Sequence, residues 1–338
     1  FYEDIFFPTL MERDIRTVVH MGDIVDRRKF INYKTLYQMR EIFFDTCWDR
    51  YINLHAIIGN HDTFFKNTNE VNSMDCLRMM MSGSEGDGGG MVRIYHDPTE
   101  VVFDGTKVFF QPWICPENKE QSLDAISNTD AQILFGHLEV QGFEMHLGAI
   151  NHEGLSPKVF EKFEYAFSGH FHHKNDDGQV FYLGSQYEMT WSDYNNQKGF
   201  HVFDTDTREL EFIPNPYTIF AKIKYDDTET DYDKFDVTEY NQKFVKLVVV
   251  NKKDNQMFDR LLDRLYKDIS VHELKILEDY SDLSHTNVSD DVVEGSEDTI
   301  TLVNNYVDQL PVDLDKDKLK VMIKEMYIEA QDTDVVAE

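Results

Sequence analysis

Four short motifs place carboxylate, amide and imidazole side chains next to glycines in this 338-residue chain. They are GDIVD, GNHD, GHLE and GHFHH, in that order, and each follows an apolar run. Oxygen and imidazole ligands without a thiolate suit a divalent metal ion such as Mn²⁺, Fe²⁺ or Zn²⁺. A glycine at each motif lets a strand end turn sharply and brings the polar side chain to the edge of a sheet. The candidate residues are Asp23, Asn60, His61, His137, His170 and His172.

The residue types are suited to two neighbouring metal ions. Asp23 follows an apolar run and has two carboxylate oxygens, so it can bridge two ions about 4 Å apart. His170 and His172 follow a glycine, and in a loop their imidazoles can face different ions. Two such ions could polarise a phosphodiester and lower the pKa of a bound water. His61 is better suited to a general acid or transition-state donor than to a ligand, with Asp62 orienting its ring.

Apolar runs before the motifs predict the strands that would position these side chains. Strands that end in functional loops with helical crossovers indicate an α/β sheet, whose ligands lie at the carboxyl ends of the strands. Helical spacing covers Tyr33–Trp48, and Asp104-Gly105 predicts a hairpin. We therefore expect an α/β (α+β) fold, a two-layer β-sandwich flanked by helices. The predicted strands are Arg16–His20, Leu54–Ile58, Val101–Phe103, Lys107–Phe110, Ile133–Phe135, Tyr165–Ser168, Val180–Leu183, Phe200–Phe203 and Leu210–Ile213.

Two prolines, Pro214 and Pro216, mark the end of this pattern. We expect residues 1–215 to form the first domain and residues 216–280 a small second domain. The second domain is predicted to be a β-α-β unit. Its expected elements are a strand over Phe244–Val250, a helix over Asp254–Lys267 and a strand over Val271–Leu277.

The rest of the chain is polar or amphipathic. Residues 281–298 are acidic and predict a disordered linker, and the glycine-rich run Ser82–Gly90 predicts a flexible surface loop. Residues 299–338 contain two stretches with amphipathic helical spacing, Thr299–Leu310 and Asp315–Ala330.

Composition limits the possible functions. A net charge of −30 argues against a generic basic nucleic-acid-binding surface. No apolar run approaches the roughly 18 residues that span a bilayer, so we expect no membrane association. Three widely spaced cysteines favour a reduced, cytoplasmic setting. One basic cluster could meet a phosphate beside the metal site, although a plain solvated surface explains it equally well. Its members are Arg27, Arg28, Lys29 and Lys34.

The motif series resembles the calcineurin-like metallophosphoesterases. Longer segments are similar to the SbcD/Mre-type nucleases, including the recombination nuclease subunits of tailed phages. These segments are GDIVDRRKFINYKT, AIIGNHDTFFKN, GHLEVQGFEM, FSGHFHH and FDTDTRELEFIPN. The resemblance implies the metallophosphoesterase fold. It also implies that residues 216–280 form a DNA-capping domain and that residues 299–338 bind a partner ATPase.

The resemblance further implies a role for each motif residue. Asp23 would bridge two divalent metal ions, expected to be Mn²⁺, with Mg²⁺ as the alternative. His172 would join Asp23 at one ion, and His61 would be the catalytic histidine. Three residues would complete the shell of the other ion: Asn60, His137 and His170. The family has an earlier Asp-x-His motif on a first strand, and no such motif precedes Asp23. We expect either that this strand is missing from the sequence or that one metal site is lost.

The implied activity is that of a DNA nuclease subunit. It would degrade duplex ends 3′ to 5′ and cut single strands together with an SbcC/Rad-type coiled-coil ATPase. The expected setting is DNA recombination, repair and phage replication or host DNA degradation, with a homodimer of the nuclease inside a heterotetramer. Two alternatives stay open. One is a phosphomonoesterase or cyclic-nucleotide phosphodiesterase, which the extra domain and the helical tail count against. The other is a non-catalytic scaffold for the ATPase.

Overall fold

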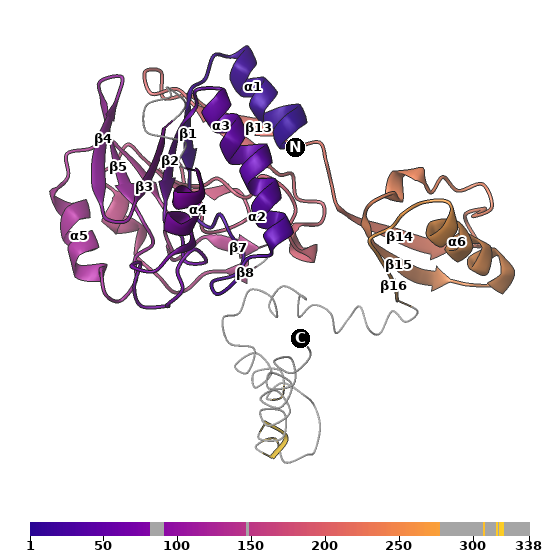
Figure 1. Cartoon of the computed structure of the whole chain (residues 1–338). Coiled ribbons are helices and arrows are strands. Elements are labelled where there is room, and N and C mark those ends of the chain that lie inside the picture. The colour runs from indigo at the N-terminus through magenta and orange to yellow at the C-terminus, as the bar shows by residue number, and fades with distance from the viewer. Residues whose placement is uncertain (82–90, 147–148, 278–306, 308–315, 317, 321–338) are drawn as a thin grey trace. The chain divides into compact units, whose positions relative to one another are not determined.

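The computed structural model describes residues 1–81, 91–146, 149–277, 307, 316 and 318–320 (Figure 1). The chain divides into two compact units. Phe1–Met189 and Asn195–Thr218 form the first unit, and Thr190–Tyr194 joins the residues from Ile219 onward in the second. The expected surface loop, the acidic linker and, apart from a few isolated positions, the two C-terminal helices lie outside the described residues.

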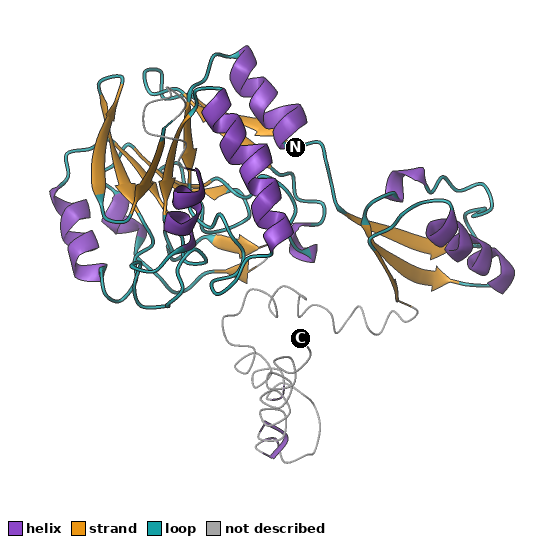
Figure 2. Ribbon diagram, viewed as in Figure 1, coloured by secondary structure: helices purple, strands orange, loops and turns teal. Residues whose placement is uncertain are grey.

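The first unit contains a small parallel sheet. Its order is β1 (Thr17–His20), β2 (Asn53–Ile57) and β3 (Val92–Tyr95). Helices lie along this sheet (Figure 2), and a buried apolar cluster joins the two: Phe6, Phe7, Leu10, Phe43 and Phe44 pack with Ile52 and Leu54. The helices are η1 (Tyr2–Phe6), α1 (Phe7–Glu12), α2 (Tyr33–Met39), η2 (Arg40–Phe44), α3 (Asp45–Asp49) and α4 (Ser73–Met81). The predicted helix over Tyr33–Trp48 is confirmed, as α2, η2 and α3 in direct succession.

The second sheet of this unit is mixed and has six strands. Their order is β10 (Asn175–Asp176), β11 (Val180–Tyr182), β9 (Tyr165–Ser168), β6 (Ile133–Gly136), β5 (Thr106–Gln111) and β4 (Thr99–Phe103). The inner four strands are parallel and the two edge strands antiparallel. The predicted hairpin is confirmed between β4 and β5. Its turn residues Asp104 and Gly105 both have positive φ, 47° and 87°, as a tight two-residue turn requires.

The two sheets share one apolar layer. Ile57 and Tyr95 of the small sheet pack against Phe110, Ile133 and Phe167 of the large one. An antiparallel ribbon, β12 (Gly199–Phe203) and β13 (Leu210–Pro214), adds side chains to the same layer. The outer face of the large sheet is covered by α5 (Lys119–Asn128) and η3 (Pro157–Phe160). A short ribbon, β7 (Glu144–His146) with β8 (Ala149–Ile150), completes the unit. The expected two-layer α/β sandwich is confirmed.

The second unit has its own sheet and core. The strands β14 (Phe220–Asp226), β15 (Phe244–Asn251) and β16 (Glu273–Leu277) are all parallel. Helix α6 (Asn255–Lys267) begins after Asp254, whose carboxylate accepts hydrogen bonds from the first free amides of the helix. Strand β14 was not among the predicted strands, although its sequence FAKIKYD alternates apolar and charged residues. Further short helices are η4 (Trp191–Asp193) and η5 (Thr238–Tyr240). Among the described residues no helix is both long and apolar enough to cross a membrane.

Candidate metal centre

Four parallel strands deliver the motif residues to one place. Asp23 follows β1, Asn60 follows β2, His137 follows β6 and His170 follows β9. Strands β1 and β2 are parallel neighbours in the small sheet, and β6 and β9 in the large sheet. Because carboxyl ends of parallel strands share one sheet edge, each sheet brings two candidate ligands to the same end of the sandwich.

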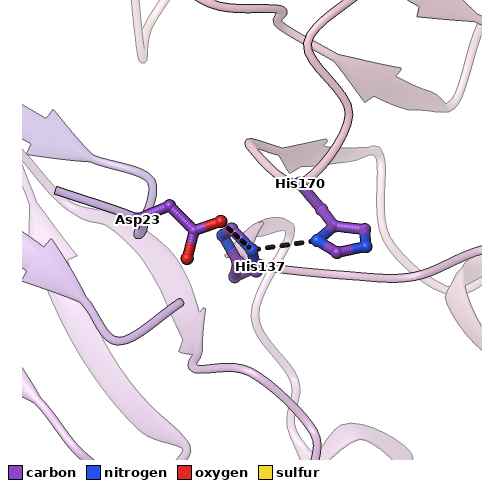
Figure 3. A group of neighbouring side chains, drawn as sticks. All are labelled: Asp23, His137 and His170. Atoms are coloured by element: carbon purple, nitrogen blue, oxygen red, sulfur yellow. Dashed lines mark hydrogen bonds and ion pairs between the residues drawn. The ribbon is translucent and has the colours of Figure 1, made fainter. Parts of the chain in front are cut away.

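Three titratable side chains converge at this end (Figure 3). The Nε2 atom of His137 lies 3.2 Å from Oδ2 of Asp23 and 3.0 Å from Nδ1 of His170. One ligand atom from each of these residues lies within 4.8 Å of those of the others. His137 is fully buried, whereas Asp23 and His170 keep partial exposure. The cluster is therefore partly open to solvent, at Asp23 and His170.

Asn60 supplies a fourth atom. Its Oδ1 lies 2.9 Å from Nε2 of His137 and 3.1 Å from Nδ1 of His170. Its side chain is 6% exposed. The amide oxygen thus points into the centre of the group, as expected of a ligand.

The donor set fits a divalent metal ion. Nδ1 of His137 lies 2.8 Å from the carbonyl oxygen of Met21, which can only accept, so Nδ1 carries a proton, and the neutral ring would present the lone pair of Nε2 to an ion. Ligand atoms at right angles on an ion, each at roughly 2.1 Å, lie about 3 Å from one another. The observed separations of 2.9–3.2 Å match that spacing. Asp23, Asn60, His137 and His170 can therefore surround one ion.

Two glycines allow this close approach. Gly22 has a φ of +90°, and a Cβ atom there would lie 2.6 Å from Nδ1 of His137. A Cβ atom on Gly59 would overlap the carboxylate and the backbone amide of Asp23. Asp23 itself has a φ of 54°, an uncommon conformation for a residue with a side chain. The glycines are thus needed to bring the GDIVD and GNHD loops into contact.

Asp62 ties these two loops together. Its Oδ2 accepts hydrogen bonds from the amides of Asp23 at 2.7 Å and Gly59 at 2.8 Å. Its Oδ1 accepts from the amide of Ile24 at 3.0 Å and the hydroxyl of Ser73 at 3.3 Å. Burial and the charge of Asp23 raise the pKa of Asp62, whereas the donors stabilise its ionised form. Asp62 is 1% exposed and holds backbone rather than substrate.

The expected orienting contact between Asp62 and His61 is not formed among the described residues. Nδ1 of His61 instead lies 2.6 Å from the carbonyl oxygen of Asp26, so it donates its proton there. The backbone amide of His61 donates to Oδ1 of Asp23 at 2.7 Å. The physical reason is that four other donors surround the Asp62 carboxylate. The ring of His61 is therefore oriented by a backbone oxygen, with Nε2 as its remaining polar atom.

The electrostatics of the cluster favour a cation. Burial raises the pKa of Asp23, but the adjacent His137 outweighs this and holds it below its ordinary range. Burial lowers the pKa of His137, but the charge and hydrogen bond of Asp23 raise it above its ordinary value. Burial and then the charge of His137 lower the pKa of His170 to about 3. The site therefore combines the ionised carboxylate of Asp23 with the imidazole of His170, which stays neutral.

His172 lies outside this group within the described part of the chain. It is partly exposed, and its charge contributes to the lowered pKa of His170. Its backbone carbonyl accepts hydrogen bonds from Nζ of Lys198 at 2.7 Å and from the amide of Ser185 at 3.1 Å. The loop that carries it is thereby fixed close to His170.

The basic cluster after the first motif is divided in the structure. Arg28 donates to Oγ1 of Thr63 at 3.1 Å, and its guanidinium lies 5.3 Å from the centre of the Trp113 ring. Arg27 pairs with Asp26 at 3.8 Å and lies over the exposed ring of Phe30. Lys29 and Lys34 are exposed. Arg28 thus helps hold the loops, and DNA binding by any of the four stays a prediction.

Two backbone carbonyl oxygens that orient histidines of the site were not predicted from the sequence. The carbonyl oxygens of Met21 and Asp26 orient His137 and His61 respectively. A backbone carbonyl carries no signal of residue type, so only the fold can reveal it. The backbone amides that donate to Asp62 likewise converge because of the conformation of the loops, which their composition does not reveal.

Comparisons with known proteins agree with this geometry. Residues 4–174 match the family described as calcineurin-like phosphoesterase. The chain is 32% identical over 320 residues to exonuclease subunit 1 of Enterobacteria phage T4, covering 94% of this chain and 88% of that protein. It is 25% identical over 222 residues to the SbcD component of the nuclease SbcCD from Staphylococcus epidermidis, covering 60% of this chain and 57% of that protein. The resemblance noted from the motifs is confirmed.

Proposed function

The chain belongs to the calcineurin-like phosphoesterase family, and from this premise we propose that it is a metal-dependent DNA nuclease subunit. The observation that carries the proposal is the convergence of Asp23, Asn60, His137 and His170 at one end of the sandwich. Two relatives, one named as an exonuclease subunit and the other as part of a nuclease, support a nucleic acid as the substrate, and we propose that it is DNA.

We propose two divalent metal ions at this site, with Mn²⁺ as the expected ion and Mg²⁺ as the alternative. Asp23, Asn60, His137 and His170 would hold one ion, and Asp23 with His172 would contribute to the second. Bound ions of this kind neutralise charge on phosphate oxygens and lower the pKa of a coordinated water.

The chain's own residues would orient the reacting groups. Asp23 is fixed by the amide of His61 through Oδ1 and lies beside His137 through Oδ2, so both its oxygens have defined directions. His61, held at Nδ1 by the carbonyl of Asp26, would use Nε2 to donate a hydrogen bond or a proton to the phosphate or its leaving oxygen. His61 is the residue we propose as catalytic.

The proposal extends to partners and domain roles. Both relatives are named as parts of larger assemblies, which supports an assembly here, and we propose an SbcC/Rad-type coiled-coil ATPase as the partner. The nuclease would form a homodimer within a heterotetramer and act in the cytoplasm, which is that of the host cell if the protein is phage-encoded, in recombination, repair or replication. Residues 216–280 would cap DNA, and residues 299–338 would bind the ATPase.

Substrate choice tests this proposal against its enzymatic alternatives. The full chain would be incubated with Mn²⁺ and 3′-labelled linear duplex DNA, circular single-stranded DNA, p-nitrophenyl phosphate or a cyclic nucleotide. We expect release of the 3′ label and cutting of the circle, both abolished by a chelator. Hydrolysis of the monoester or the cyclic nucleotide with both DNAs intact would overturn the proposal. No hydrolysis of any substrate, with or without the ATPase, would favour the scaffold.

A further inference from the structure

Three lysines form a row across the sheet of the second unit. Lys222 on β14 is paired in register with Lys246 on β15, and Lys246 with Lys275 on β16. Residues in such a row point to the same face of the sheet. Neighbouring strands are about 4.8 Å apart, so the row extends over about 10 Å. Lys224 lies two residues after Lys222 on the same face.

The row occupies the face that α6 does not cover. The alternate residues of β14 and β15 are buried with Phe258, Leu261 and Leu265 of α6. They include Ile223, Tyr225, Val245 and Leu247. Lys222 and Lys275 are exposed and Lys246 is partly exposed. The row therefore lies on the side of the sheet opposite α6, with Phe220 and Phe244 two residues before Lys222 and Lys246 on the same side.

Aromatic rings support two of the lysines. Nζ of Lys246 lies 4.1 Å from the centre of the Trp191 ring, and Nζ of Lys222 lies 4.4 Å from that of Tyr194. Trp191 packs in turn on Phe220 at 4.7 Å between ring centres. Both rings come from Thr190–Tyr194, the short segment that joins this unit from an earlier part of the chain. Contact with ring faces limits the positions of the ammonium groups before any ligand arrives.

The ammonium groups of the row lie close enough for their charges to repel one another. Like charges directly opposite each other on neighbouring strands destabilise a sheet. Burial first, and then the charges of Lys246 and Lys224, lower the pKa of Lys222. The chain carries a net charge of −30, so a concentrated positive row departs from its general surface. The carboxylate of Glu273 is also exposed on this face, two residues before Lys275.

We propose that Lys222, Lys246 and Lys275 bind successive phosphates of a nucleic-acid backbone. The inference rests on the proposed nuclease function and names a surface of the second unit that holds the substrate. Lysine contacts to phosphate give affinity and salt dependence without reading base sequence, which suits an enzyme that degrades DNA. The surface lies within one unit, so it does not depend on how the two units are arranged.

Binding measurements test this row. The probe is a fluorescently labelled 30-base-pair duplex, titrated with the full chain at several salt concentrations. The variant is K222Q/K246Q/K275Q, and its matched control is K234Q/K253Q/K267Q, which removes three exposed lysines of the same unit outside the row. Each lost phosphate contact lowers the slope of log K against log salt by roughly 0.9. We expect the row variant to lose about 2–3 units of slope and at least about tenfold in affinity, and the control to lose less than about 1 unit.

Two further measurements keep the result decisive. The variant K222R/K246R/K275R should bind the duplex with an affinity within about threefold of the parent's, because charge rather than residue type is required. Melting temperatures of all variants would identify loss of folding, and the arginine variant then decides the question. Equal slopes in the row variant and the parent, or equal losses in row and control variants, would overturn the inference.

Hydrolysis of bis-p-nitrophenyl phosphate by the parent tests the metal centre separately. If the parent hydrolyses that diester but does not bind DNA, the nuclease proposal itself fails.

Discussion

The carboxylate of Asp62 accepts a hydrogen bond from the backbone amide of Asp23 at 2.7 Å, although the two residues are 39 positions apart. The same oxygen accepts from the amide of Gly59. One buried side chain thus joins the loop that carries the first ligand to the loop that carries the second. This contact fixes the backbone of Asp23, whose side chain is held separately by the amide of His61.

Replacing this carboxylate should therefore damage the fold and the metal site together. In Asp62→Asn an NH₂ group must face one of the backbone donors, and leaving a buried donor unsatisfied costs about 1–3 kcal/mol. We expect the free energy of unfolding in urea to fall by that amount and the bound Mn²⁺ to fall with it. The exposed Asp97→Asn is the control, and both its values should match the parent. Parent-like stability with lost turnover would show that Asp62 acts in chemistry instead.

His61→Ala should separate metal binding from turnover. Its ring is held by a backbone carbonyl and lies outside the cluster of Asp23, His137 and His170, so metal content should stay at the parent level. Turnover should fall by about 10²–10⁴-fold, the usual contribution of a general acid. Mass spectrometry of bound metal and single-turnover cleavage measure the two quantities. Metal loss as large as that of Asn60→Ala would make His61 a ligand.

A histidine in the sandwich core should make stability depend on pH. His55 is 6% exposed, and its Nδ1 lies 2.7 Å from the hydroxyl of Tyr95. Burial, followed by the charge of Arg93, lowers its pKa to about 4. Below its ordinary pKa of about 6.5 the unfolded chain takes up a proton that the folded chain excludes. The contribution of His55 to the free energy of unfolding is therefore fully present above about pH 6.5, and it declines as the pH falls towards 4.

The decline has a maximal slope of about 1.4 kcal/mol per pH unit for one proton. His55→Gln should remove this contribution to the slope of the free energy of unfolding against pH between pH 6.5 and pH 4. The slope would be measured by urea unfolding with a chelator present. The exposed His152→Gln serves as the control and should keep the slope of the parent. An identical slope in His55→Gln and the parent would mean that His55 is protonated in the folded state.

The C-terminal segment should be needed to bind the partner ATPase but not to bind the metal ion. Its stripes, Leu302, Tyr306 and Leu310 followed by Leu319, Ile323 and Tyr327, need an apolar surface to cover them. A chain ending at Asp282 should keep its Mn²⁺ content and lose capture of the cognate ATPase in a pull-down. The full chain carrying Asp298→Asn controls for a change in the acidic linker. Undiminished capture by the shortened chain would place the docking surface elsewhere.

Much of the fold was predictable because its signals are local. The strands before Asp23, Asn60, His137 and His170 are apolar runs that end at a glycine, and each was found within a residue or two of its bounds. Strand β14 was missed, since its alternating lysines resemble a solvated surface. The contact of Asp62 with Asp23 was not predictable, because it joins backbone amides whose positions only the folded loops define. The second ion's shell stays a prediction that rests on Asp23 and His172.

The most direct test of the metal centre pairs metal content with DNA cleavage in His137→Ala. His137 is the fully buried centre of the cluster, with Asp23, Asn60 and His170 all within 3.2 Å of its Nε2 atom. The control is His152→Ala, which removes an exposed histidine. Mn²⁺ per chain would be measured by mass spectrometry after dialysis, and cleavage by release of a 3′ label. We predict that His137→Ala loses tightly bound Mn²⁺ and cleaves at less than about one hundredth of the parental rate while the control matches the parent. Parental metal content and cleavage in a folded His137→Ala protein would contradict the assignment of this site.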